Sequence, residues 1–253
     1  MALSRRPHGG YLRLAMGPPK ERRIIVREMA EPRRDLAMGT ALLAAFGLWT
    51  AMVQLVDVRP VGQNGTDVGF AAFNVWFHGL TGVHMVLYAI TDWLGLVPVA
   101  VCLGFGAMGA TQLVRRRSLL AVDPDLLLLG VHYVLIAAAY LVFEAFPINY
   151  RPIPIDGVME ASYPSSTTLL VLGVMPTLAY QVVRRSKSIQ AKVAVVAFVA
   201  AFSALMVAGR LVSGVHWATD IVGSILLAAS LFAMYRYAVA RADARITTAR
   251  SER

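Results

Sequence analysis

The stretch GRLVSGVHWATD, residues 209–220, joins two apolar runs that are each long enough to cross a lipid bilayer. This short connection contains a guanidinium, an imidazole and a carboxylate, carried by Arg210, His216 and Asp220. His216 and Asp220 are four residues apart, so they share one face in a helix that begins near His216. We therefore expect Asp220 to accept the Nδ1 proton of His216, which leaves Nε2 free to act as a nucleophile.

The same three residues also have a purely structural interpretation. Arginines at helix ends commonly extend their guanidinium to the membrane surface, and His and Asp side chains form buried polar pairs in membrane bundles. Three residue types at fixed spacing are a weak pattern by themselves. The choice between a catalytic triplet and a polar helix junction therefore depends on the rest of the chain.

The composition is that of an integral membrane protein. Of the 253 residues, 57% are hydrophobic and only 15% are charged, and the mean hydropathy is +0.60. The net charge of +9 comes from basic residues spread over several short connections and tails, which is typical of topology signals rather than of a nucleic-acid-binding patch. The single cysteine, Cys102, excludes an intrachain disulfide and a cysteine metal site.

The apolar segments predict an all-α integral membrane protein, a bundle of six transmembrane helices. Residues 36–239 are expected to form this membrane domain, between a basic tail at residues 1–35 and another at residues 240–253. Most Lys and Arg residues fall on one side of the six-span arrangement, so the positive-inside rule predicts that both termini are cytoplasmic. Pro98 and Pro176 are expected to kink two of the spans. The spans are expected near residues 36–55, 92–113, 124–146, 166–183, 189–210 and 217–238.

The longest outward connection, residues 57–91, is expected to contain a helix that lies in the outer membrane interface. Its large apolar residues recur at helical spacing: Phe70, Phe73, Phe77 and Leu80. A lipid-facing collar is the favoured interpretation, and a gate for a lipid headgroup is the alternative. His78 and His84 are expected to be interface residues rather than ligands.

Two further features lie on the outward side. Arg151-Pro152 follows the third span, and Pro164-Ser165-Ser166-Thr167 directly precedes the fourth. A proline followed by serines predicts a helix start, where unpaired amides and the positive end of the dipole attract anions. Taken alone, these features also fit an ordinary helix cap and a loop arginine that faces water. Together, two guanidiniums and a helix N-terminus form a cradle for phosphoryl oxygens, with His216 placed to attack phosphorus.

The order of these pieces resembles the type-2 phosphatidic acid phosphatase superfamily, which includes vanadium haloperoxidases and polyprenyl pyrophosphate phosphatases. That family carries a Lys and Arg-Pro in its first motif, Pro-Ser-Gly-His in its second, and Ser-Arg with a spaced His and Asp in its third. The resemblance implies that His216 is a nucleophile that forms a phosphohistidine, with Asp220 as its orienter. It implies neither a metal ion nor another cofactor. The phosphate-binding groups that it implies are Arg151, Arg210, Ser165 and Ser166.

Three positions depart from the family pattern. Glu144 falls where the first-motif lysine is expected, and Gly209 stands where a serine usually precedes the arginine. Thr167 replaces the second-motif histidine that protonates the leaving group, and a threonine cannot serve as a general acid near neutral pH. A lipid pyrophosphate releases a phosphate monoester, which departs with far less help than an alkoxide, so Thr167 favours a pyrophosphate over phosphatidate. The candidate replacement acids are Glu144, Asp156 and Glu160, each of which also fits a solvated loop carboxylate.

The sequence therefore predicts a metal-independent hydrolase of the cytoplasmic membrane, which acts at the outer face on a lipid phosphate or pyrophosphate, with polyprenyl pyrophosphate favoured. Its expected partners are this substrate and the membrane lipids, without nucleic acid. Two alternatives stay open. A phosphotransferase on the same scaffold would pass the phosphoryl group to a lipid or sugar hydroxyl. A non-catalytic lipid-phosphate binder or transporter would keep the cradle without turnover, because Glu144 and Thr167 replace the usual Lys and His.

Overall fold

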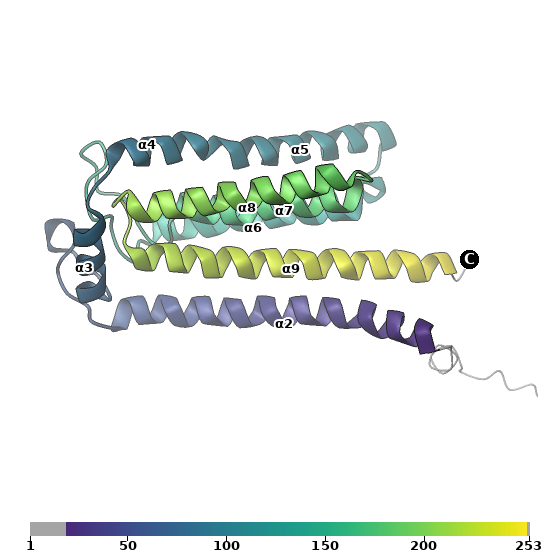
Figure 1. The fold of residues 1–253 in the computed structure, drawn as a ribbon, viewed down its shortest axis with the longest axis horizontal. Helices are drawn as coiled ribbons and strands as arrows, with labels where there is room; N and C mark the ends of the chain where they lie inside the picture. The colour runs from purple at the N-terminus through teal and green to yellow at the C-terminus, as the bar shows by residue number, and fades with distance from the viewer. Residues whose placement is uncertain (1–18, 252–253) are drawn as a thin grey trace, which may run out of the picture.

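The computed structural model describes residues 19–251, which form an all-helical bundle without a β-strand in that range (Figure 1). Six helical segments of this part are long and apolar enough to cross a membrane. The predicted six-helix membrane bundle is thereby confirmed, whereas residues 1–18 of the predicted basic tail lie outside the described residues. The helices are α2 (Pro19–Leu55), α3 (Ala71–Thr81), α4 (Met85–Leu94), α5 (Leu96–Arg116), α6 (Pro124–Ala145), α7 (Ser166–Arg185), α8 (Ile189–Val212) and α9 (Ala218–Ser251).

The short helix α3 crosses one end of the bundle, where the connections 56–70, 146–165 and 213–217 also gather (Figure 1). We call this end the site end. The first described residues of α2 and the last of α9 lie together at the opposite end. Both chain ends of the described part therefore share one side of the bundle, and the assignment of that side to the cytoplasm stays a prediction.

The central helix is α9, which packs against α2, α6, α7 and α8. Small residues allow α2 to approach it closely, because a Cβ on Gly39 would lie 2.9 Å from the Met234 side chain. Ser230 Oγ donates to Gly39 O at 2.8 Å across the same contact. Large apolar side chains on the outer faces, such as Leu103 and Leu141, are exposed and suit contact with lipid.

The second span begins earlier than the sequence indicated. Helix α4 already starts at Met85, so residues 85–91 are helical rather than part of the long connection. The span is broken at Gly95, because Pro98 has no N–H for the Leu94 carbonyl and its ring would clash there. Pro176, the second proline expected to kink a span, lies within α7, which continues on both sides of it.

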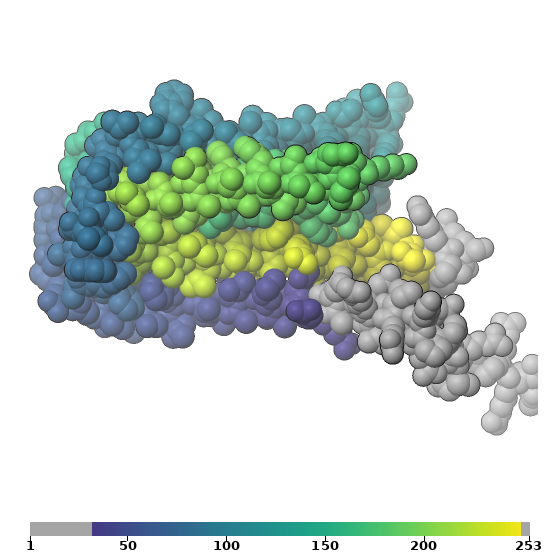
Figure 2. Space-filling view, in the orientation of Figure 1, coloured from purple at the N-terminus to yellow at the C-terminus, as the bar shows by residue number. Residues whose placement is uncertain are grey.

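Helix α3 occupies the position predicted for a helix in the long connection, and it covers the site end in the view of Figure 2. Trp76 and Leu80 are exposed on it, while Asn74 is buried against the bundle. Asn74 Nδ2 donates to Thr219 Oγ1 at 3.0 Å. This contact fixes α3 against the start of α9, directly behind the connection 213–217.

Candidate active site

The connection 213–217 reverses the chain between α8 and α9 and depends on Gly214. This residue has a φ of 72°, and a Cβ on it would lie 2.0 Å from the carbonyl oxygen of Gly82. The backbone N–H of His84 donates to Ser213 O at 3.0 Å beside this contact. Only glycine fits such a turn, which is pressed onto the loop between α3 and α4.

Two aromatic side chains hold the turn from either side. Trp217 Nε1 donates to Tyr150 O at 2.9 Å, and His78 Nε2 lies 3.1 Å from Gly214 O. A carbonyl oxygen can only accept, so Nε2 of His78 carries the proton. The rings of His78 and Trp217 lie 5.7 Å apart. His78 therefore orients the turn.

His216 and Asp220 are linked through a third residue, Ser162. His216 Nδ1 lies 3.8 Å from Asp220 Oδ2, too far for the direct hydrogen bond expected from the sequence. Ser162 Oγ stands between them, 3.1 Å from His216 Nδ1 and 2.5 Å from Asp220 Oδ2. The predicted geometry was wrong because α9 begins at Ala218, so His216 lies before the helix and not one turn from Asp220 on it.

This chain of contacts defines the tautomer of His216. The Ser162 hydroxyl has one proton, which it donates to the Asp220 carboxylate, so its oxygen accepts from Nδ1–H of His216. Nε2 of the neutral ring therefore carries a lone pair. Asp220 is also held by Asn149 Nδ2 at 3.0 Å and by the backbone N–H of Trp217 at 2.9 Å. An ionised carboxylate with three donors is well suited to orient the imidazole.

The environment of His216 favours its neutral form. Burial, followed by the positive charges of Arg151 and Arg210, holds the pKa of His216 well below its usual value. Its Nε2 atom is buried and has no hydrogen-bond partner among the described residues. The residue therefore presents an unprotonated nitrogen at neutral pH, as a nucleophile requires.

Arg210 is fully buried and is held by one of its terminal nitrogens. Nη2 donates to Asp92 Oδ1 at 2.7 Å and to Thr167 Oγ1. The guanidinium lies over the Tyr88 ring, 4.9 Å from its centroid. Its Nε and Nη1 have no partner among the described residues. Two donors thus stay available beside His216.

Gly209 makes the contact between Arg210 and Asp92 possible. A Cβ on Gly209 would lie 2.6 Å from Cγ2 of Thr91, so any larger residue would push α4 away from α8. Thr91 directly precedes Asp92 on α4. Replacement of the usual serine by Gly209 therefore does more than remove a hydroxyl. It allows α4 to pack close enough for the Asp92 carboxylate to contact Arg210.

Arg151 approaches the same place from the connection between α6 and α7. Its Nη2 forms an ion pair with Glu160 Oε2 at 3.0 Å, and its backbone N–H donates to Glu160 O at 3.1 Å. The guanidinium lies 5.9 Å from the centroid of the Tyr88 ring, which it shares with Arg210. Nε and Nη1 of Arg151 are buried and have no partner in the described part.

The start of α7 reaches the site through Ser166 and Thr167. Ser165 is its N-cap, but the Ser165 hydroxyl donates to Thr168 Oγ1 at 3.1 Å and is fully buried. Ser166 instead lines a cavity of about 430 Å³ together with Arg151. As the first residue of the helix, Ser166 has a backbone N–H without an intrahelical acceptor. We therefore place Ser166, rather than the Ser165 side chain, at the edge of the anion site.

The predicted replacement acids occupy different places. Glu144 is exposed and lines the same cavity as Arg151. Glu160 lines it too, but it is paired with Arg151. Asp156 lies in the turn between Ile155 and Val158, outside this lining.

Sequence reasoning missed Ser162, Asp92 and Tyr88. Ser162 carries no motif of its own, although it lies two residues before the Pro164-Ser165-Ser166-Thr167 motif. Asp92 and Tyr88 come from α4, more than a hundred residues before Arg210 in the sequence. Only the polarity of Asp92 inside an apolar run gave a signal, because intramembrane carboxylates are rare and are usually functional or paired.

Comparison with known proteins agrees with this geometry. A family model described as PAP2 superfamily matches residues 126–243, from α6 into α9. The matched region covers just under half of the chain. The PAP2 region includes Arg151, Ser162, Arg210 and the connection 213–217. Helix α4, with Tyr88 and Asp92, precedes the PAP2 match and still contributes to the site.

The fold is similar to the crystal structure of the first transmembrane PAP2 type phosphatidylglycerolphosphate phosphatase from Bacillus subtilis. The TM-score is 0.55 and the sequence identity is 21%, over 78% of this chain and 94% of that one. At this identity the likeness concerns the PAP2 fold. No curated protein matches the chain. In the described part, no group of three or more His, Cys, Asp or Glu residues is arranged to hold a metal ion.

Proposed function

We propose that the chain is a membrane phosphatase that hydrolyses a lipid pyrophosphate through a phosphohistidine on His216. One observation carries the proposal. In the described part of the chain, Nε and Nη1 of Arg151, Nε and Nη1 of Arg210, and Nε2 of His216 are all buried without hydrogen-bond partners. Buried donors without a partner cost free energy of folding. A doubly charged phosphoryl group accepts hydrogen bonds from the four guanidinium nitrogens, while its phosphorus meets the lone pair of His216 Nε2.

In the first step, His216 Nε2 attacks the terminal phosphorus of the lipid pyrophosphate. The N–P bond forms as the bridging P–O bond breaks, and its electron pair leaves with the lipid monophosphate. The imidazole keeps its Nδ1 proton, so the phosphorylated ring gains positive charge. Ser162 and the carboxylate of Asp220 stabilise that charge. Arg151 and Arg210 stabilise the phosphoryl oxygens in the transition state.

The leaving group follows from Thr167. Its hydroxyl accepts from Arg210 Nη2, and a hydroxyl with an alcohol-like pKa does not protonate an alkoxide. A departing phosphate monoester, whose second pKa is about 6, needs no proton in the transition state. The proposal therefore names a pyrophosphate, and polyprenyl pyrophosphate is the favoured lipid.

In the second step, water attacks the phosphohistidine. The O–P bond forms, the N–P bond breaks, and its electron pair returns to Nε2. Inorganic phosphate leaves, and neutral His216 is restored. We place this reaction at the outer face of the cytoplasmic membrane, because Arg115 and Arg116 end α5 and Arg117 follows it at the end of the bundle opposite the site.

The test is phosphate release by purified protein from a polyprenyl pyrophosphate and from phosphatidate. We expect turnover of the pyrophosphate, its loss in His216→Ala, and retained turnover in the matched control His84→Ala, because His84 is exposed and bonded to Thr81 O. Rapid quenching with labelled substrate should trap acid-labile phosphohistidine on His216. Comparable turnover by wild type and His216→Ala would contradict the assignment.

The alternatives give different results in the same assay. A phosphotransferase would form a phosphorylated product when a lipid or sugar alcohol is added, at the expense of inorganic phosphate. A lipid-phosphate binder would retain the substrate on a filter or in a detergent micelle without a trapped phosphohistidine. Product analysis with and without acceptor alcohols therefore separates the three functions.

A further inference from the structure

The cavity that Arg151 lines adjoins a second cavity that runs into the bundle. The first contains Arg151 and Glu160, and both cavities are lined by Tyr140, Ser166 and Leu169. The second has a volume of about 380 Å³ and a mostly apolar lining between α5, α6 and α7. Thr167 belongs to it as well. The end of the second cavity at Thr167 therefore lies beside the proposed phosphate site.

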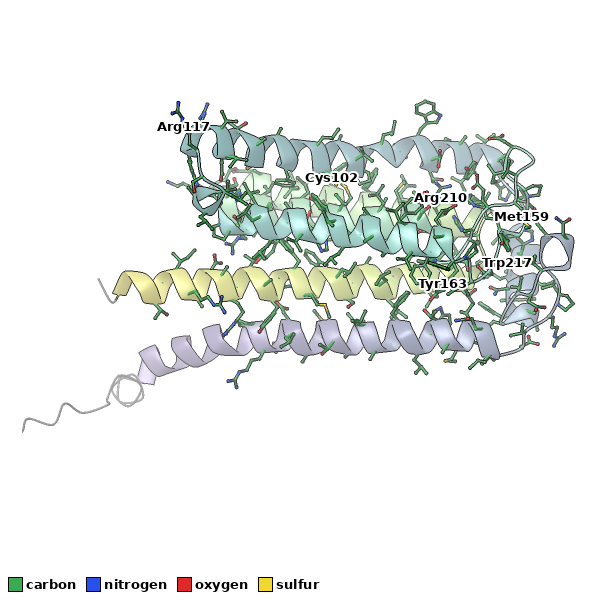
Figure 3. The ribbon with its side chains drawn as sticks, turned by 180° about the vertical axis from the view of Figure 1, so that it is seen from behind. Cys102, Arg117, Met159, Tyr163, Arg210 and Trp217 are labelled. Carbon is green, nitrogen blue, oxygen red and sulfur yellow. The ribbon has the colours of Figure 1, made fainter. Side chains whose placement is uncertain are left out.

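A third cavity, of about 200 Å³, continues in the same direction between α5 and α6. It shares Cys102 and Tyr133 with the second cavity. Figure 3 shows Cys102 about midway along the span formed by α4 and α5, with Arg210 toward the site end and Arg117 at the opposite end. The third cavity reaches Leu113 on α5 and Leu119 in the turn that follows. We call the second and third cavities together the α5–α6 groove.

The length of this path exceeds one membrane leaflet. From Glu144, at the first cavity, to Leu126, at the third, the rise along α6 is about 27 Å. Half of a hydrocarbon core of about 30 Å is only about 15 Å. A chain that starts at the phosphate site and follows the groove therefore passes the middle of the bilayer and approaches the far side.

We propose that the α5–α6 groove binds the hydrocarbon tail of the substrate as a single long polyprenyl chain, and selects for chain length. This inference rests on the proposed phosphatase function. A diacyl lipid carries two tails of about one leaflet in length, which are shorter than this path. A polyprenyl chain is single, apolar and longer than a leaflet. Its pyrophosphate would lie against Arg151, which lines the first cavity, and Arg210, which contacts Thr167 at the edge of the second.

Glycines form part of the wall of the third cavity. Gly106, Gly109 and Gly130 line the third cavity, and a Cβ on any of them would meet no atom within 4 Å. A side chain added there enters the groove without displacing the helix. Gly104 lies on the same helix and is equally unobstructed, but it does not line the cavity. Gly104 therefore provides a matched control for substitutions on α5.

The groove predicts that Gly109→Leu discriminates between substrates by chain length. Gly109 lies about 21 Å along the helices from Gly95, which neighbours Thr167 at the phosphate site. With undecaprenyl pyrophosphate, kcat/KM should fall about tenfold or more, because the added side chain blocks the space of several methylenes. With farnesyl pyrophosphate, whose chain ends before Gly109, it should change less than about twofold. Gly104→Leu should leave both substrates unchanged.

Equal losses with the long and the short substrate, or no loss with either, would overturn the groove assignment while leaving the phosphatase function intact. A second measurement does not need turnover. Undecaprenyl monophosphate with a diazirine near its tail end should crosslink to residues 109–130 of the full-length protein in lipid nanodiscs. Gly109→Leu should abolish this crosslink and Gly104→Leu should keep it. Crosslinks confined to other segments would contradict the proposal, even if no pyrophosphate were hydrolysed.

Discussion

The carboxylate of Asp92 accepts a hydrogen bond of 2.7 Å from Nη2 of Arg210. The same nitrogen donates to Thr167 at the position where the PAP2 pattern has its proton-donating histidine. In this chain the side chain at that position thus holds an arginine. Because this carboxylate is engaged with the Arg210 guanidinium, we assign Asp92 as a positioning residue.

Removal of the Asp92 carboxylate should weaken substrate binding. Asp92→Ala leaves Arg210 Nη2 with Thr167 alone, so the guanidinium loses its orientation. Because Asp92 is largely exposed, its contribution is discounted for solvent screening, and we expect kcat/KM to fall about tenfold, mainly through KM. Asp92→Asn keeps an acceptor and should lose less. Asp67→Ala, another exposed carboxylate of the site end, should behave as wild type; an unchanged KM in Asp92→Ala would refute the role.

The Ser162 bridge should affect turnover rather than binding. Ser162→Ala leaves His216 Nδ1 without its acceptor and removes one donor from Asp220. We expect kcat to fall about ten- to a hundredfold with little change in KM, as for other partners that orient a reactive group. Ser203→Ala is the matched control, because the Ser203 hydroxyl on α8 has no partner among the described residues. A KM effect of the same size would show that Ser162 binds substrate instead.

The acid limb of the pH profile should move when Arg151 is neutralised. In the wild type, burial and the charges of Arg151 and Arg210 lower the pKa of His216, so the ring stays neutral below the usual histidine range. Arg151→Met removes one repulsive charge and raises that pKa, so protonation begins at higher pH. The acid limb of kcat/KM should shift upward relative to wild type. The substrate ionises identically in both assays, so a limb that does not move would exclude His216 as the titrating group.

Thr167→His should alter the preference between leaving groups. An imidazole at this position can donate a proton, and the adjoining cavity provides space for the ring. Hydrolysis of phosphatidate, which releases an alkoxide, should gain relative to hydrolysis of a polyprenyl pyrophosphate. The ratio of the two kcat/KM values measures this change. Thr167→Val, which removes the contact with Arg210 without adding an acid, should not raise the ratio; an equal rise in both variants would refute the leaving-group argument.

Gly214→Ala should damage the fold at the site. The alanine would need a positive φ, and its Cβ would collide with Gly82 O, so the turn would have to shift. Strain and steric conflict of this kind cost about 1–3 kcal/mol or more, which should appear as a lower melting temperature in detergent. Gly104→Ala, in open space on α5, should preserve or raise it. Equal stability of both variants would contradict the close contact at Gly82.

Local sequence patterns were sufficient to predict the bundle. They also singled out the charged residues that the structure brings together at the site end. Long apolar runs fix the six spans, because a helix that crosses a membrane must be apolar along its length. The bridge by Ser162 could not be predicted, since it joins residues that are 54 positions apart through the path of an irregular loop. The position of the break at Gly95 could not be predicted either. Pro98 indicated that the helix is distorted, but packing determines at which residue it is interrupted.

The contact of Gly209 with Thr91 has a consequence for how such sequences can change. A residue larger than glycine at position 209 would separate α4 from α8 and carry Asp92 out of reach of Arg210. We therefore expect substitutions at positions 209 and 92 to be coupled. Among homologues, glycine at the first position should accompany an acidic residue at the second, and chains with serine there should have an unrelated residue in place of Asp92. Homologues that carry both residues would form a group in which contacts that fix an arginine stand in place of a proton donor.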